Sequence, residues 1–149
     1  MTKMDELDLQ ILKGLQKDCR ILQEIADNLK TPVSTIHYRV RRLEREGVIK
    51  GYFAQLDANK LNLNIQAIVH VYARHGPTFE DLGIQIGNID GVSKVFWAYG
   101  EVDFFVFARA HDLNEFNTII RKIMNIDGVE KTNSNVIAKV VKDDMRLNI

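Results

Sequence analysis

A five-residue segment occurs twice in the C-terminal half of this chain. Asn88-Ile89-Asp90-Gly91-Val92 recurs, 37 residues later, as Asn125-Ile126-Asp127-Gly128-Val129. Each copy ends a segment in which apolar residues recur at helical spacing, over residues 78–89 and 113–126. The glycine of each copy can terminate the helix and turn the chain into a strand. The repeat therefore predicts two similar helix–strand halves packed in one domain.

Segments with the composition of β-strands flank both expected helices. They cover residues 65–74, 92–99, 102–110 and 129–142. The resulting order is βαββαβ, which predicts a ferredoxin-like unit whose two halves are related by a pseudo-twofold axis. Asp112 and Glu115 fit a variant of the capping box at the start of the second helix, with Asp as the N-cap.

The N-terminal third has the pattern of three helices. Apolar spacing predicts the first over Asp5–Leu15, with Asp5 as N-cap, and the second over Ile21–Leu29. The third is expected over Pro32–Glu46, capped by Thr31 and stopped by Gly47. Because the second and third helices are joined by a tight connection, they predict a helix-turn-helix. The following Val48–Ala54 looks extended and is expected to form a wing or a linker strand.

The expected third helix has two chemically distinct faces. At 100° per residue, Val33, Ile36, Val40 and Leu43 form one apolar stripe. The opposite face and its flanks carry hydroxyl, aromatic and basic groups: Ser34, Thr35, His37, Tyr38, Arg39, Arg41, Arg42 and Arg45. A helix that enters the DNA major groove needs short polar groups near its start and arginines further along. A plain three-helix module with a solvated third helix remains the alternative.

The overall charge does not by itself favour nucleic acid. The chain has 20 Lys and Arg against 20 Asp and Glu. Residues 1–60 hold 11 basic and 9 acidic residues, whereas the remainder is slightly acidic. The stretch Thr31–Leu43 contains three arginines and one histidine but no acid, which gives a local positive surface. Low overall charge predicts weak non-specific binding, so specificity should depend on base contacts and paired half-sites.

The sequence lacks the motifs that are typical of enzyme active sites and metal sites. A single cysteine, Cys19, excludes an internal disulfide framework and a Cys-based zinc cluster. The four histidines form no H-x-x-x-H or H-E-x-x-H pair, and no G-x-S-x-G, phosphate-binding or G-x-G-x-x-G motif occurs. The interpretation is a protein that is not an enzyme, with no metal. No apolar run is long enough for a membrane span and no secretory signal is evident, so a cytoplasmic location without membrane contact is expected.

The run from Ser34 to Tyr52 resembles the signature of the Lrp/AsnC (feast/famine) transcription regulators, R-[IV]-x-x-L-E-x-x-G-[VI]-I-x-G-Y. Leu7–Leu12 and the following Leu15–Asp18 are similar to the family's first helix. Two positions depart from the family pattern: Lys30 stands where a turn glycine is usual, and Pro32 stands where a capping serine is usual.

The C-terminal region resembles the family's RAM domain, so the resemblance covers nearly the whole chain. It implies an α+β protein with a winged-type helix-turn-helix domain at 1–51, a linker strand or hinge at 52–63, and a ferredoxin-like RAM domain at 64–149. The family's RAM domain dimerises through its sheet, its dimers often form rings of four, and small amino acids bind between dimers. A homodimer that assembles into a tetramer of dimers is therefore expected.

The resemblance also indicates an effector site. Tyr99-Gly100-Glu101-Val102-Asp103-Phe104 is similar to the family's G-x-x-D turn, and Thr132-Asn133-Ser134 to its T-x-T strand. Tyr99, Gly100, Glu101, Asp103, Thr132 and Ser134 are the expected effector-binding residues. Asp103 could pair with a ligand ammonium, and N–H groups of the glycine turn with its carboxylate. Alternatively, Gly100 and Asp103 only stabilise the turn.

These patterns together predict a sequence-specific transcription regulator that binds double-stranded DNA at paired half-sites and responds to an amino acid. Ser34, Thr35, Tyr38 and Arg41 are the expected base readers, with His37 nearby. Arg39, Arg42, Arg45 and Lys50 are expected phosphate contacts. Two rivals remain: an amino acid sensor that acts through a protein partner, and an enzyme with a regulatory ferredoxin-like domain. No cofactor other than an amino acid effector is expected.

Overall fold

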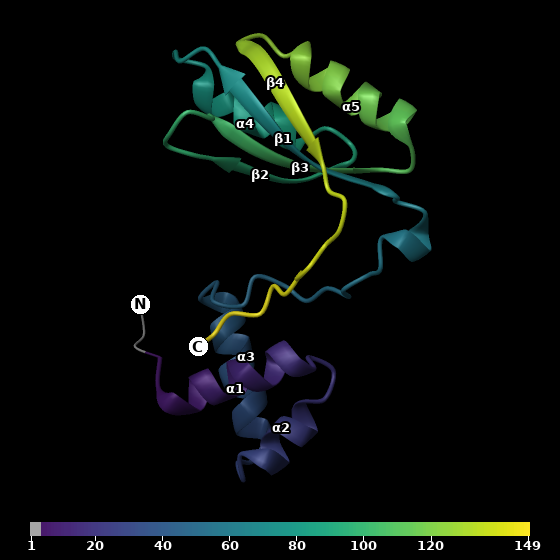
Figure 1. The fold of residues 1–149 in the computed structure, drawn as a ribbon. Helices are drawn as coiled ribbons and strands as arrows, with labels where there is room; N and C mark the ends of the chain where they lie inside the picture. The colour runs from purple at the N-terminus through teal and green to yellow at the C-terminus, as the bar shows by residue number, and fades with distance from the viewer. Residues whose placement is uncertain (1–3) are drawn as a thin grey trace. The chain divides into compact units, whose positions relative to one another are not determined.

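The computed structural model describes residues 4–149, which divide into two compact units (Figure 1). One unit runs to Gln55 and includes the C-terminal tail, Lys142–Ile149. The other covers Leu56–Val141. The tail was expected to belong to the RAM-like domain at 64–149, but its contacts group it with the helical unit.

The first unit contains the three expected helices: α1 (Glu6–Lys17), α2 (Leu22–Asn28) and α3 (Val33–Arg45). Asp5 caps α1 as expected, because its carboxylate accepts the Asp8 N–H while the Asp8 carboxylate accepts the Asp5 N–H. A buried apolar cluster holds the three helices together: Ile11, Ile25, Ala26, Ile36 and Val40.

The second unit is the expected βαββαβ fold. Its elements are β1 (Ile65–Ala73), α4 (Phe79–Gly87), β2 (Val92–Trp97), β3 (Phe104–Ala110), α5 (Leu113–Met124) and β4 (Val129–Val136), preceded by the short 3-10 turn η1 (Asn59–Leu61). The four strands are antiparallel in the order β2-β3-β1-β4. The last strand ends at Val136, six residues before the expected Lys142.

The core of this unit lies between the sheet and its two helices. Alternate residues of β1 and β3 are buried, including Val69, Val71, Phe104 and Val106. They pack in one cluster with apolar side chains of α4 and α5: Leu82, Ile86, Phe116, Ile119 and Ile123. Figure 1 shows both helices with this sheet. Within residues 56–141, no helix covers the other face of the sheet.

The repeated pentapeptide forms the same turn twice. Val92 N–H donates to Ile89 O at 3.0 Å, and Val129 N–H donates to Ile126 O at 3.1 Å. The glycine in each turn has a positive φ, 89° at Gly91 and 97° at Gly128, as the third residue of a type II turn requires. The glycines turn the chain into a strand as expected, but the helices end earlier, with Asn88 and Asn125 as C-caps.

Each repeat glycine is also anchored to a neighbouring strand. Gly91 O accepts the Arg109 N–H and Gly128 O accepts the Arg74 N–H, both at 2.8 Å. The two turns therefore make equivalent contacts in the two halves, which gives the repeat in the sequence a structural cause.

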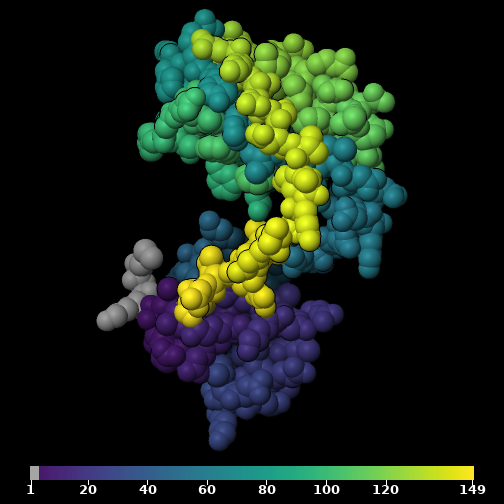
Figure 2. Space-filling view, viewed as in Figure 1, coloured from purple at the N-terminus to yellow at the C-terminus, as the bar shows by residue number. Residues whose placement is uncertain are grey.

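Two chain segments join the helical unit to the sheet unit. The first follows α3. Residues Val48–Ala54 were expected to form a wing or a linker strand, and this prediction is wrong because the segment pairs with no strand. An extended segment becomes a strand only with a ladder partner, and none is supplied here. The second is the tail, whose Leu147 N–H and carbonyl both bond the Gln16 side-chain amide. Figure 2 shows the tail, in yellow, against the purple helices.

Among residues 4–149, no helix has the length and apolar character needed to cross a membrane.

Candidate nucleic-acid interface and effector region

The turn between α2 and α3 sets the direction of the third helix. Lys30 N–H donates to Asp27 O at 3.1 Å and Thr31 N–H to Ala26 O at 3.0 Å, the bonding pattern of a Schellman motif. Lys30 occupies the left-handed position of that motif, with φ 48°. A glycine adopts this conformation without strain, so the structure accounts for the glycine that is usual at this position in the family.

The expected capping of α3 by Thr31 is wrong. Pro32 is the N-cap residue and makes no side-chain cap bond, and the helix begins at Val33. The Thr31 hydroxyl instead donates to Leu29 O at 3.0 Å, so its side chain stabilises the turn. The end of the helix follows expectation, since Gly47 has φ 73° and the Val48 N–H donates to Leu43 O at 2.9 Å.

The apolar stripe of α3 is buried as predicted. Ile36 and Leu43 are fully buried, Val40 nearly so, and Val33 packs at the edge of the cluster. Apart from Glu44, which accepts the Tyr52 hydroxyl, the side chains that remain exposed on this helix are Ser34, His37, Tyr38, Arg41 and Arg45. At 100° per residue they lie within about 100° of one another around the helix axis. They form one continuous polar face, which we call the exposed face of α3.

The three remaining candidates on the helix lie elsewhere. Thr35, Arg39 and Arg42 are only partly accessible. Both arginines bind acids at the start of α1: Arg39 Nη1 lies 2.6 Å from both Asp5 carboxylate oxygens and 2.9 Å from Asp8 Oδ1, and Arg42 Nη2 lies 2.5 Å from Asp8 Oδ2. Their charge is thus already matched within the protein, and their expected role as phosphate contacts, which stays a prediction, would require these ion pairs to open.

These ion pairs also shift the pKa of the exposed partner. The hydrogen bonds that Asp5 accepts from Arg39 and from the Asp8 N–H lower its pKa to about 2. Asp8 is fully buried, with both of its oxygens bonded to arginines. Sequence reasoning identified Asp5 as an N-cap but did not pair the acids near the start of the chain with α3. The complementary acid-free stretch on α3 was the signal that could have done so.

A second side-chain contact fixes the segment after α3. The Tyr52 hydroxyl donates to Glu44 Oε1 at 2.9 Å. Partial burial, together with this carboxylate, raises the pKa of Tyr52 to about 12. The bond holds residues 47–52 back against the end of α3 and leaves Lys50 exposed beside it.

The expected effector residue Asp103 is already engaged inside the sheet unit. Its Oδ2 accepts the Ala73 N–H at 2.8 Å, and its Oδ1 lies 2.8 Å from His75 Nε2. The Asp103 side chain is 13% exposed, and the His75 ring stacks on Phe79 with centroids 4.4 Å apart. The residue therefore ties the end of β1 to the β2–β3 hairpin, whether or not a ligand binds there.

The other residues of the hairpin are accessible. Tyr99 is 97% exposed, with its ring 5.8 Å from that of Trp97, and Gly100 and Glu101 are also exposed. The hairpin thus presents an aromatic surface next to the Asp103 carboxylate.

Thr132 and Ser134 share one face of β4, as predicted from their spacing. They pair with Val71 and Val69 of β1, whose side chains point into the core, so both hydroxyls lie on the helix-covered side. Val71 also pairs with Phe104, next to Asp103. The structure brings Thr132 to the same end of the sheet as Asp103, but β1 lies between them, so the two backbones are about 10 Å apart.

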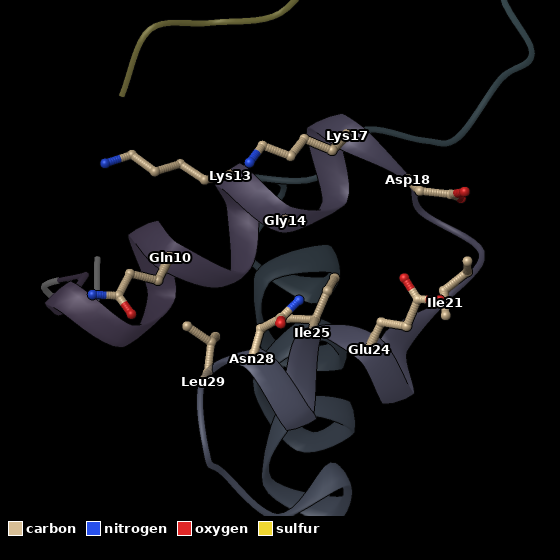
Figure 3. Close-up of a pocket in the computed structure, with 10 residues that line it drawn as sticks. All are labelled: Gln10, Lys13, Gly14, Lys17, Asp18, Ile21, Glu24, Ile25, Asn28 and Leu29. Carbon is tan, nitrogen blue, oxygen red and sulfur yellow. The ribbon is translucent and has the colours of Figure 1, made fainter.

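A groove of about 400 Å³ lies on the helical unit, lined by residues of α1, α2 and their connection (Figure 3). Gly14 forms part of it, and Ile25 points toward Gly14 from α2. A Cβ at position 14 would lie 2.9 Å from Ile25 Cγ1, so the glycine permits the close approach of the two helices. No lining residue belongs to α3, so the groove is separate from the exposed face of α3.

Comparisons with known proteins agree with both units. A family model described as winged helix-turn-helix DNA-binding matches residues 4–50, and one described as Lrp/AsnC ligand binding domain matches residues 66–147. An uncharacterized HTH-type transcriptional regulator of Pyrococcus abyssi is 37% identical over 97% of this chain and 98% of its own. The leucine-responsive regulatory protein of Salmonella typhimurium is 28% identical over 98% and 92%.

A solved structure shows the same fold over almost the full length. The complex of a Neisseria meningitidis transcriptional regulator with L-Met aligns with a TM-score of 0.90 and 26% identity, covering 98% of this chain and 97% of that one. Because the family models together cover most of the chain and the P. abyssi relative matches it end to end, this protein belongs to the Lrp/AsnC family of DNA-binding transcription regulators.

Proposed function

We propose that the exposed face of α3 reads base edges in the major groove of an operator. Ser34, His37, Tyr38 and Arg41 supply hydroxyl, imidazole and guanidinium groups that can bond base edges, with Thr35 at the flank. Arg45 and Lys50 lie further along and bind phosphates. The observation that carries this proposal is the single polar face left exposed on α3 directly after the tight α2–α3 turn.

Arg41 distinguishes base reading from phosphate binding. Arg41→Ala should cost about 1–3 kcal/mol on a cognate duplex if the guanidinium makes a bidentate base contact. Arg45→Ala, one turn further along the same face, is the matched control and should weaken cognate and unrelated duplexes alike. Binding is measured by fluorescence anisotropy on duplexes selected from a random pool. Equal losses for Arg41→Ala on both duplexes would assign Arg41 to phosphate instead.

The protein acts as a homodimer through the uncovered sheet face, with dimers assembling into a ring of four. That face carries Ile68 and Tyr72 on β1, Phe105 and Phe107 on β3, and the half-exposed Phe96 on β2. An apolar face of this kind, with helices only on the other side, is the type of surface that oligomers bury. Phe107→Glu should lower the mass measured by light scattering, whereas Asn117→Glu, on the exposed side of α5, should not. An unchanged mass for Phe107→Glu would contradict this interface.

The effector is an amino acid bound beside the β2–β3 hairpin, in the region of Tyr99, Gly100, Glu101 and Asp103, with Thr132 and Ser134 at the same end of the sheet. The support is the chemistry of Asp103, whose carboxylate can accept an ammonium in addition to its present bonds. The similarity to a regulator solved with L-Met supports the ligand class. As β1 separates Asp103 from Thr132, one small ligand cannot contact both within a single chain, so a neighbouring subunit completes the site.

Asp103→Asn is a sharper test than replacement by alanine. The asparagine oxygen can still accept the Ala73 N–H and so keep the end of β1 in place, but it cannot form an ion pair with an ammonium. Titration calorimetry with L-methionine, and then with the other amino acids, should show lost binding in the variant while DNA binding without effector is kept. Unchanged affinity would leave Asp103 with a purely structural role. We further propose that the protein acts in the cytoplasm, where its DNA target lies.

A further inference from the structure

Helix α3 carries two arginines, Arg39 and Arg42, whose charge is matched within the helical unit. Asp5 and Asp8, at the N-cap and third position of α1, hold Arg39 and Arg42 through contacts of 2.5 to 2.9 Å. The two arginine side chains are 21% and 17% exposed, and the Asp8 side chain is 1% exposed. The cluster thus spans from a buried centre at Asp8 to an accessible edge at Asp5, whose side chain is 53% exposed.

The buried half of the cluster is costly to open. Removing Arg42 from Asp8 would leave a buried carboxylate without its partner, which is far more costly than a phosphate contact returns. The accessible half is different, because solvent screens the Arg39–Asp5 pair and weakens it. Asp5 is therefore the residue that determines whether Arg39 stays paired within the protein or binds a DNA phosphate.

We propose that Asp5 and Asp8 set the DNA affinity of this protein by withholding Arg39 and Arg42 from the phosphates, Asp8 as a positioning residue of α3 and Asp5 as the adjustable one. Of the five basic residues between Val33 and Lys50, only Arg41, Arg45 and Lys50 then act on DNA. Sequence-independent binding of the protein to DNA phosphates is therefore weak. Occupancy of an operator then depends on the base contacts that two protomers make together.

The salt dependence of binding counts the cations that reach phosphates. Each phosphate contact contributes about 0.9 to the slope of log K against log salt. Two phosphate-binding cations, Arg45 and Lys50, in each of two protomers give a slope of about −4, whereas adding Arg39 and Arg42 would give about −7. A merely structural role for Asp5 would alter stability but would leave this slope unchanged.

Asp5→Asn is the informative variant. Asparagine is as good an N-cap as aspartate, so α1 keeps its start while Arg39 loses its exposed anionic partner. Asp18→Asn is the control: Asp18 holds Arg20 in an accessible pair at 2.9 Å, with side chains 33% and 82% exposed, its pKa is likewise lowered to about 2, and it does not contact α3. Both variants remove one negative charge.

The experiment measures anisotropy of a labelled 30-base-pair duplex of mixed sequence with the full-length protein, as salt is varied. Asp5→Asn should steepen the slope by up to about 0.9 for each bound protomer, which is about an eightfold gain in K per tenfold drop in salt. Asp18→Asn should keep the wild-type slope. Arg39→Gln alone should also keep it, and should abolish the effect of Asp5→Asn in the double variant.

Three results would overturn the proposal. One is an unchanged slope in Asp5→Asn. Another is an equal change in Asp18→Asn, which would show that the slope depends only on the net charge of the protein. The third is a shallower slope in Arg39→Gln alone, because Arg39 would then already contact phosphate in the wild-type protein.

Discussion

Replacing the two repeat glycines by alanine should have unequal effects, although both have nearly the same backbone conformation. Each position has a φ near +90°, where an L side chain costs roughly 1–2 kcal/mol. At Gly128 an added Cβ would meet Leu82 Cδ1 at 3.3 Å, and the end of a leucine side chain can yield. At Gly91 it would lie 2.5 Å from Ile119 Cδ1 and 2.9 Å from Arg109 O.

The close oxygen at Gly91 belongs to the backbone of β3, which is held by the bond from the Arg109 N–H to Gly91 O. The turn cannot move away without losing that bond, so overpacking adds about 1–3 kcal/mol to the strain. Gly91→Ala should therefore lower the free energy of unfolding by about 2–5 kcal/mol, and Gly128→Ala by about 1–2 kcal/mol. Gly76→Ala is the control, because an added Cβ meets nothing there within 4 Å.

Urea unfolding followed by Trp97 fluorescence reports on this unit alone, since the chain has one tryptophan and it lies on β2. The variants should be compared at one protein concentration, because association of subunits adds to apparent stability. Equal midpoints for Gly91→Ala and Gly128→Ala would refute the argument from the β3 carbonyl. A Gly128→Ala midpoint equal to that of Gly76→Ala would refute the argument from positive φ.

Three further predictions concern the helical unit. Lys30→Gly should raise the melting temperature, by an amount equivalent to about 1 kcal/mol or less, because it relieves a left-handed lysine in the α2–α3 turn; a lower melting temperature would contradict that conformation. Gly14→Ala should lower the helical content retained on heating, followed by circular dichroism, because its Cβ would lie 2.9 Å from Ile25; Ile25→Val in the same background should restore part of the loss, and no restoration would point to another cause. The low pKa of Asp5 and Asp18, about 2 against an ordinary 3.8, predicts stability that is fully present above pH 4 and is lost as pH falls from about 4 toward 2; thermal melts of wild type and Asp5→Asn over this range should differ in slope, and identical slopes would contradict the Arg39 contact.

Sequence patterns were enough for the architecture. The repeated turns and the alternating strands specify the βαββαβ order, because both depend on local periodicity and on a backbone conformation that only glycine adopts freely. The apolar stripe with Ile36 and Val40 was predicted for the same reason. Helix and strand ends were less well predicted, as at β4, since they depend on whether a ladder partner is present.

These patterns could not predict which groups the long side chains contact. Helical periodicity gives the direction of the Cβ atom, but an arginine can bend several ångströms from it toward a nearby charge. Arg42 was expected on the outward face for that reason, and it lies against Asp8 instead. Asp103 shows the same limit, because its bond to the Ala73 N–H joins positions that are distant in sequence. The Gln16–Leu147 contact likewise depends on tertiary structure alone.

The most direct test of DNA recognition by the exposed face of α3 is a footprint on duplexes that the full-length protein selects from a random pool. The proposal predicts enriched sequences with two half-sites related by a two-fold axis, and hydroxyl-radical protection on one side of the duplex with centres about one helical turn (~34–36 Å) or a multiple apart. Arg41→Ala should lose that enrichment while still binding unrelated duplexes. Selection of a single asymmetric site, or an unchanged selected sequence with Arg41→Ala, would contradict it.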